Sequence, residues 1–180
     1  MDNKKLIAGF GYQEGRISSW DGKRTYTASA PQLAKDCCDN GADEILIYDW
    51  SVTDEDHEAA IAVIKEVCRE ADAPVIAGGR VKRMEDVKKY LYAGASAVFL
   101  DMSKEENADM IKEASDRFGK EKIYAYLPTD AYLEQVKQYE AAGASVMLLN
   151  TAGSVPSLLE MASISDSEMP FMFFLQAKDD

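Results

Sequence analysis

The sequence has few of the residues that build metal centres and disulfide frameworks. Its 180 residues include three cysteines and one histidine. Cys37, Cys38 and Cys68 are too few and too irregularly spaced for a disulfide framework. We expect reduced cysteines whose side chains pack on the apolar faces of helices. His57 lies in the acidic run Asp54–Glu58, where we expect an exposed helix start, and no second histidine completes a zinc site or a nucleophilic triad. We therefore expect no metal and no cofactor.

Positive charge and long apolar runs are also scarce. Acidic residues number 32 and basic residues 20, which leaves a formal net charge of −12. Such a chain repels phosphate backbones and anionic lipids, so nucleic acid and membrane surfaces are poor partners. No apolar run approaches the ~20 residues of a membrane helix, and Met1–Ile7 leads straight into a short strand rather than a signal sequence. We expect a cytoplasmic protein with one globular domain.

What the sequence does have is a regular alternation of apolar strands and amphipathic helices. Seven strands are predicted, at Leu6–Phe10, Glu44–Asp49, Pro74–Ala77, Ala97–Asp101, Lys122–Leu127, Ser145–Leu149 and Phe171–Leu175. Six helices are predicted between them, at Ala30–Asn40, Asp54–Ala71, Met84–Ala93, Glu105–Phe118, Ala131–Ala142 and Val155–Ala162. Three helix-to-strand junctions resemble one another, and each places a glycine where the helix must stop: Asn40–Asp43, Ala93–Ser96 and Ala142–Ser145.

This alternation predicts an α/β fold, namely a TIM-type (β/α) barrel that is incomplete and has about seven βα units. An open doubly wound sheet alternates in the same way but normally stops near five or six strands. A complete barrel has eight strands in about 250 residues, whereas this chain ends just after the seventh. We therefore expect a single barrel domain over residues 1–180, either unusually closed or the N-terminal part of a longer protein. Its strand edges need a cover from a partner surface, a terminal extension or the Arg16–Trp20 segment, and we expect a dimer or a fused neighbour.

Three blocks of sequence carry a family resemblance. Glu14–Ile17 follows the first strand, Pro31–Ile45 leads into the second, and Pro74–Val81 ends the third with a glycine-rich turn. By the order and spacing of these blocks, the stretch from Tyr12 to Phe118 resembles the ribulose-phosphate-binding barrels of histidine biosynthesis. These are the cyclase subunit of imidazole glycerol phosphate synthase and the phosphoribosylformimino-5-aminoimidazole carboxamide ribotide isomerase. The resemblance implies a barrel that takes a phosphorylated ribotide.

The resemblance also implies where catalytic acids should lie, and both positions hold other residues. The relatives end strand one with a catalytic aspartate where this chain has Gly11, and they close strand five with a second one where this chain has Pro128. Opening a ribose ring and moving a proton needs both a donor and an acceptor. No catalytic residue is therefore expected, and Glu14, Asp49 and Asp130 are only weak substitutes.

The Gly78-Gly79-Arg80 turn is the candidate phosphate-binding site. Glycines let backbone N–H groups approach an anion, the following helix N-terminus favours negative charge, and Arg80 would strengthen the site. The alternative is that the turn only joins strand to helix, with Arg80 facing solvent. Asp101 would weaken the site, because the resemblance implies a small or amide residue there and a carboxylate repels a dianion.

Three further features leave alternatives open. Asp49 matches an aspartate of the relatives, and we expect it in the barrel mouth with a hydrogen-bonded structural role. Trp20 and Trp50 follow the first two strands and either line a ligand mouth or cover an opening left by the missing strand. Thr151–Ser154 is the one small-residue loop near the second phosphate site of the relatives, and a helix N-cap at Ser154 explains it better.

These observations predict a histidine-biosynthesis-related barrel that is catalytically degenerate and acts as a phosphoribosyl-ligand-binding or scaffold module. The expected partners are a phosphorylated ribotide or another phosphate-like anion, a second copy of the chain, and an associated histidine-pathway domain. The alternative is an active aldose–ketose isomerase or cyclase with repositioned acids at Glu14, Asp49 or Asp130. A third interpretation is a structural assembly module whose partner surface is the apolar segment Met169–Leu175.

Overall fold

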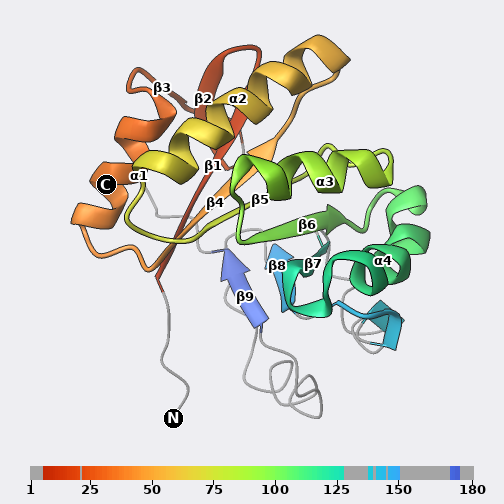
Figure 1. The fold of residues 1–180 in the computed structure, drawn as a ribbon. Coiled ribbons are helices and arrows are strands. Elements are labelled where there is room, and N and C mark those ends of the chain that lie inside the picture. The colour runs from red at the N-terminus through yellow and green to blue at the C-terminus, as the bar shows by residue number, and fades with distance from the viewer. Residues whose placement is uncertain are drawn as a thin grey trace. The chain divides into compact units, whose positions relative to one another are not determined.

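Strands and helices alternate along the chain (Figure 1). The computed structural model describes residues 6–20, 22–127, 138–139 and 141–144, together with the backbone of 146–150 and 171–174. The chain divides into two compact units, Met1–Val98 and Phe99–Asp180. No helix within the described ranges is long and apolar enough to cross a membrane.

The first unit is a sheet with helices on one face (Figure 1). Its elements are β1 (Ile7–Gln13), β2 (Arg16–Ser19), β3 (Thr25–Tyr26), α1 (Ala30–Asp39), β4 (Glu44–Asp49), α2 (Asp54–Glu70), β5 (Val75–Gly78) and α3 (Met84–Ala93). The strand order is β3-β2-β1-β4-β5, and β1, β4 and β5 pair in parallel. All six residues of β4 are buried, which suits a central parallel strand.

The edge of β1 is covered from within the chain. β2 folds back and pairs antiparallel with β1, in a register that sets Gly11 opposite Ser18. Parallel strands with an open edge expose unpaired N–H and C=O groups, and this hairpin satisfies them along the second half of β1. Of the three expected covers, the Arg16–Trp20 segment is the one that pairs with β1, while the expected dimer or fused neighbour stays a prediction.

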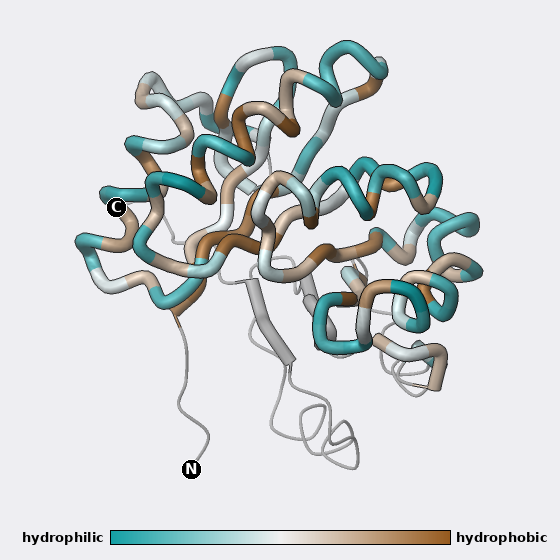
Figure 2. The backbone as a smooth tube through the Cα atoms, in the orientation of Figure 1, coloured by the Kyte–Doolittle hydropathy of each residue, from teal (hydrophilic) through white to brown (hydrophobic). Residues whose placement is uncertain are grey.

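Each helix of the first unit begins and ends where local chemistry dictates. Thr53 precedes α2, and its hydroxyl accepts a hydrogen bond from the N–H of Asp56, which caps the helix. The acidic first turn of α2 suits the positive end of the helix dipole. After α3, Gly94 adopts φ 110°, a left-handed conformation that glycine tolerates and that stops the helix before the next strand. Hydrophobic residues lie along the strands, and hydrophilic ones cover the outer turns of the helices (Figure 2).

The second unit continues the same pattern. The strand β6 (Ala97–Asp101) begins at the end of the first unit and finishes in the second. Then follow α4 (Glu105–Phe118), a 3-10 turn (Lys120–Lys122), β7 (Ile123–Leu127), β8 (Val146–Asn150) and β9 (Phe171–Phe174). β7 pairs in parallel with β8, and β8 in parallel with β9.

The fold class is that of an incomplete TIM-type (β/α) barrel, as predicted. All seven predicted strands are present as β1 and β4 to β9, and the described bounds of α3 and α4 are those expected from the sequence. The helices predicted at Ala131–Ala142 and Val155–Ala162 lie largely or wholly outside the described residues. A single domain over residues 1–180 stays a prediction.

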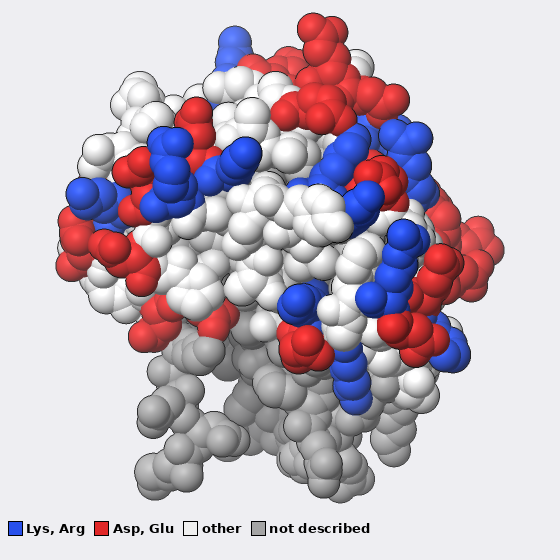
Figure 3. Space-filling view, viewed as in Figure 1, with Lys and Arg blue, Asp and Glu red and all other residues white. Residues whose placement is uncertain are grey.

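Basic and acidic side chains interleave on the face shown in Figure 3. Several form pairs across or along the helices, such as Lys112 with Asp116 on α4 and Lys89 on α3 with Glu58 on α2. Exposed pairs of this kind contribute little to stability. They do, however, prevent lysines and arginines on this face from forming a continuous basic surface, in keeping with the excess of acidic residues.

Candidate functional site

The carboxyl ends of the first three parallel strands meet in one row. Gly11 of β1 lies opposite Tyr48 of β4, and Tyr48 lies opposite Gly78 of β5. In (β/α) barrels this end of the strands is where ligands bind and catalytic residues lie. The row is therefore the place to look for a site, and here it consists of one large aromatic residue between two glycines.

Aromatic side chains fill the space beside this row. The Tyr48 ring stacks on the Trp50 indole with centroids 3.7 Å apart and planes 18° apart, and Trp20 meets Tyr48 edge-on at 5.4 Å. Tyr48 is fully buried, while Trp50 keeps 39% of its surface exposed. We call Trp20, Tyr48 and Trp50 the aromatic cluster. It lies at the carboxyl ends of the strands, a position common to both interpretations of the tryptophans.

Trp50 occupies the space in front of Gly11. A Cβ atom added to Gly11 would lie 2.8 Å from both Cδ1 and Nε1 of Trp50 and 3.0 Å from Oγ of Ser18. Contacts below 3.0 Å are essentially never tolerated, so even an alanine would force a neighbour to move. The resemblance implies a catalytic aspartate at this position in the relatives. In this chain, the Trp50 indole occupies the space beside it.

Gly79 has a packing role in the same cluster. It adopts φ 102°, and a Cβ there would lie 2.5 Å from Cε1 of Tyr48 and 2.9 Å from the carbonyl oxygen of Asp49. Both the backbone conformation and the ring contact require glycine, whether or not an anion binds. The glycine pair of the candidate phosphate-binding turn therefore has a structural explanation of its own.

Arg80, the third residue of that turn, is buried rather than solvent-facing. Only 3% of its surface is exposed, and its guanidinium donates a hydrogen bond to Oδ1 of Asp54 in α2. This hydrogen bond, assisted by the arginine charge, holds the pKa of the Asp54 carboxyl below its usual range. The interpretation that Arg80 faces solvent is wrong, and its charge is already compensated within the protein.

Asp49 points away from the aromatic cluster, because successive side chains of a strand lie on opposite faces of the sheet. Its Oδ1 accepts the N–H of Ser51 at 2.9 Å, and its Oδ2 lies 2.7 Å from Nδ1 of His57 and accepts the Tyr90 hydroxyl at 2.8 Å. Burial, with the nearby Asp49 charge, raises the pKa of Tyr90 well above its ordinary value, so its hydroxyl remains a donor. The expected place in the barrel mouth is wrong: Asp49 lies between sheet and helices.

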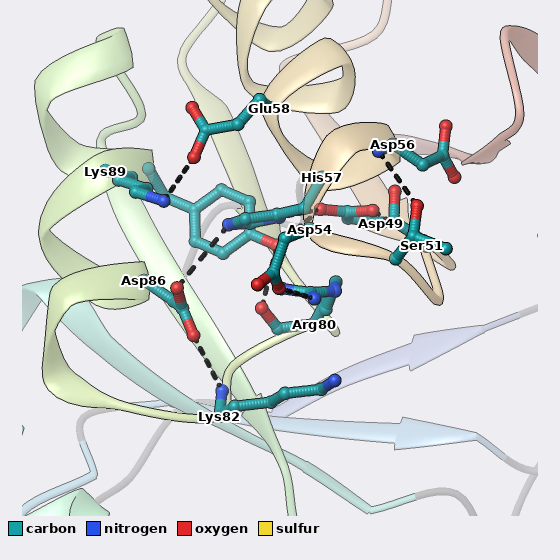
Figure 4. Close-up of polar contacts among 12 residues, drawn as sticks. Asp49, Ser51, Asp54, Asp56, His57, Glu58, Arg80, Lys82, Asp86 and Lys89 are labelled. Atoms are coloured by element: carbon teal, nitrogen blue, oxygen red, sulfur yellow. Dashed lines mark hydrogen bonds and ion pairs between the residues drawn. The ribbon is translucent and has the colours of Figure 1, made fainter.

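His57 is buried, which makes the expectation of an exposed helix start wrong. The buried residues of α2 are His57, Ala60, Ile64 and Val67, which recur at the spacing of one helix face. That face packs on the sheet, so His57 lies against Asp49 (Figure 4). Its ring also meets the Tyr90 ring of α3 edge-on. The acidic neighbours of His57 suggested solvent, but the periodicity of Ala60, Ile64 and Val67 could have indicated burial.

Asp86 and Tyr90 of α3 complete a buried polar cluster that sequence reasoning missed. Asp86 is 1% exposed, its Oδ2 accepts the backbone N–H groups of Lys82 at 3.0 Å and Arg83 at 3.2 Å, and its Oδ1 lies 3.7 Å from Nε2 of His57. An acidic residue three positions after the N-cap residue, here Arg83, is a capping pattern that the sequence alone indicates. Its pairing with His57 depends on a contact between two helices and is not readable in that way.

The other predicted site residues have contacts of their own or are outside the described structure. Glu14 is exposed in the β1–β2 turn with φ 48°, and its N–H donates to Oδ2 of Asp56 at 3.1 Å. Asp101 ends β6 in the second unit, where its Oδ1 accepts hydrogen bonds from the N–H and hydroxyl of Ser103. The remaining positions are outside the described residues or described in backbone only: Pro128, Asp130, Thr151–Ser154 and Met169–Leu175.

The chemistry open to the described residues is limited. Asp49 and Asp86 are both buried and hydrogen-bonded, so neither is placed to exchange a proton with a ligand. No group of three or more histidine, cysteine or acidic side chains able to hold a metal ion occurs in the part of the chain that the structure describes. What remains at the strand ends is a rigid aromatic surface and a glycine-rich turn.

The fold is that of an incomplete (β/α) barrel whose first three parallel strands end in one row. The model of the family described as "Histidine biosynthesis protein" matches residues 14–151. This chain belongs to that family, so the resemblance indicated by its motifs is confirmed.

Individual relatives agree with the family. The imidazole glycerol phosphate synthase subunit HisF of Dictyoglomus turgidum is 31% identical over 116 residues, which cover 64% of this chain and 42% of the relative. The same subunit of Dictyoglomus thermophilum is 37% identical over 90 residues, covering 50% and 36%. That of Staphylococcus aureus is 31% identical over 126 residues, covering 68% and 50%. The chain thus spans half or less of the length of these relatives.

Proposed function

We propose that this chain is a catalytically degenerate histidine-biosynthesis barrel that acts in the cytoplasm as a scaffold or phosphoribosyl-ligand-binding module beside active pathway enzymes. The observation that carries the proposal is the contact between Gly11 and Trp50. The resemblance implies an aspartate at Gly11, and the indole of Trp50 leaves no room for even a Cβ there. A catalytic side chain at this position would require the indole of Trp50 to move.

The energetic consequence for catalysis is large. A positioned carboxylate that transfers a proton typically contributes 10²–10⁴-fold to a rate, and ribotide isomerisation or cyclisation uses an acid and a base together. Gly11 supplies neither, and Pro128 has no ionisable group at the second position. Turnover by this chain should therefore fall far below that of the relatives.

The alternative function is an active isomerase or cyclase that uses Glu14, Asp49 or Asp130. The burial of Asp49 under Ser51, His57 and Tyr90 argues against one of the three, because releasing it would break three hydrogen bonds. Glu14 is exposed, but its backbone is tied to Asp56 in the hairpin turn.

A ligand-binding role and an assembly role have different support. The exposed part of Trp50 offers a flat apolar surface at the strand ends, which suits a planar heterocycle. The pairing of Arg80 with Asp54 weakens the case for a phosphate on the glycine-rich turn. The relatives are named as subunits of a synthase, and we extend that association to this chain, with a pathway domain or a second copy as partner.

A turnover assay on the wild-type chain and on substituted variants tests whether the barrel is catalytically degenerate or is an active enzyme. The purified chain is incubated with the phosphoribosylformimino ribotide beside a sample that contains no protein. We expect no product above the uncatalysed background from this chain, and no change with Glu14→Ala, Asp49→Asn or Asp130→Ala. Turnover that any one of these substitutions lowers by tenfold or more, in a variant that still folds, would establish the alternative.

A further inference from the structure

The buried histidine raises a question about protons that is independent of the proposed function. His57 lies between two carboxylates, with Nδ1 2.7 Å from Oδ2 of Asp49 and Nε2 3.7 Å from Oδ1 of Asp86 (Figure 4). All three side chains are about 1% exposed. They come from β4, α2 and α3, so this one ring connects a strand to two helices.

The contact with Asp49 fixes one proton. Oδ2 of Asp49 also accepts the Tyr90 hydroxyl, and Oδ1 accepts the N–H of Ser51, so the carboxylate acts as an acceptor throughout. The short contact to His57 is therefore a hydrogen bond donated by Nδ1–H. In a neutral imidazole with its proton on Nδ1, Nε2 is left as a bare acceptor.

The contact with Asp86 then lacks a donor. Nε2 of His57 and Oδ1 of Asp86 both have no hydrogen-bond partner within the described part of the chain, although both are fully buried. Two acceptors facing each other at 3.7 Å repel, and each would also carry the cost of an unsatisfied buried polar atom. A proton between them removes both costs.

A bridging water molecule does not fit the geometry between Nε2 of His57 and Oδ1 of Asp86. A water donating to both atoms through hydrogen bonds of about 2.8 Å would need them roughly 4.5 Å apart, given the angle between its two O–H bonds. The observed separation is 3.7 Å. A direct N–H···O contact needs only a small shift from the same geometry.

We propose that His57 is held as a doubly protonated imidazolium between Asp49 and Asp86, and that loss of this proton is a pH-sensitive switch for the contact between α2 and α3. The proton resides on the ring, because two backbone N–H groups and the Arg83 guanidinium 3.6 Å away favour the charged form of Asp86. The other charged groups around the ring pair among themselves: Arg80 with Asp54, and Lys89 with Glu58. Tyr90 contributes a neutral hydroxyl.

The direction of the effect follows from proton linkage. The folded chain binds a proton that an unfolded histidine, half-protonated near pH 6.5, releases at neutral pH. The stabilisation is therefore complete in mildly acidic solution and is lost as the pH rises until the folded cluster gives up its proton.

Nitrogen NMR tests the proposal without ambiguity, because the chain has a single histidine. In the full chain, without any histidine tag and with ¹⁵N-labelled histidine, we expect two protonated ring nitrogens at about pH 8, where a free imidazole is more than nine-tenths neutral. The Asp86→Asn variant should show a neutral ring at the same pH, because its amide can donate to Nε2. The Glu58→Gln variant, which removes a nearby exposed carboxylate, should keep the wild-type spectrum.

Two results would overturn the proposal. A neutral His57 ring in the wild-type chain at about pH 7 would refute it directly, whatever the variants do. Equal loss of stability between about pH 6 and pH 9 in wild type and in Asp86→Asn, measured by urea denaturation, would show that the proton has no part in the pH response. If the Asp86→Asn variant fails to fold, the protonation state of the His57 ring in the wild-type chain still tests the proposal.

Discussion

Replacing Gly11 by alanine tests the contact that carries the functional proposal. The added Cβ would lie 2.8 Å from two atoms of the Trp50 indole and 3.0 Å from the Ser18 hydroxyl. Overpacking of this kind costs about 1–3 kcal/mol, and the lower chain entropy of alanine in the unfolded state returns about 0.4–1 kcal/mol. We expect Gly11→Ala to lower the free energy of unfolding by about 1–2 kcal/mol.

A double-mutant cycle in urea, followed by circular dichroism, isolates the cause. Trp50→Ala removes the indole and costs stability of its own, because the ring stacks on Tyr48. In that background Gly11→Ala should be neutral or slightly stabilising, which gives a coupling free energy above about 1 kcal/mol. If Gly11→Ala costs the same with and without the indole, Trp50 does not close this position and the reasoning fails.

Three further predictions concern Gly79, Cys68 and Asp54. Gly79→Ala should destabilise the chain by about 2–4 kcal/mol in urea denaturation, since it combines a left-handed backbone with a clash against Tyr48. Burial raises the pKa of Cys68 to about 11, so its thiol should be alkylated far more slowly by iodoacetamide at pH 8 than in the urea-unfolded chain, as mass spectrometry of the peptide can show. The Arg80 hydrogen bond lowers the pKa of Asp54, so wild type should exceed Asp54→Asn in stability near neutral pH and lose that advantage as the pH falls through the folded pKa.

Most of the fold could be predicted from the sequence because strands, helices and helix ends are specified by residues close together in the chain. Apolar runs separated by glycine-terminated amphipathic helices specify the order of elements, and α3 ends at the glycine that its sequence indicates. The need for a cover at the strand edge was predictable, because such an edge needs hydrogen-bond partners wherever it occurs, and the Arg16–Trp20 segment was one of three covers considered.

The site was less predictable, because its contacts join distant segments. The acidic run around His57 is solvated on one helix face, but the histidine belongs to the opposite face and meets Asp49 and Asp86. Similarly, the glycine pair at Gly78 and Gly79 has the same sequence whether it cradles an anion or accommodates Tyr48. Sequence identifies such positions as special but not what occupies the space beside them.

The absence of turnover is the central claim, and one calorimetric titration tests it most directly. The purified chain is titrated with the phosphoribosylformimino ribotide, and the same sample is then analysed for isomerised or cyclised product. The account predicts no product, with either a simple binding heat, as for a ligand-binding module, or no heat, as for a scaffold. Binding accompanied by product well above the uncatalysed background would contradict it.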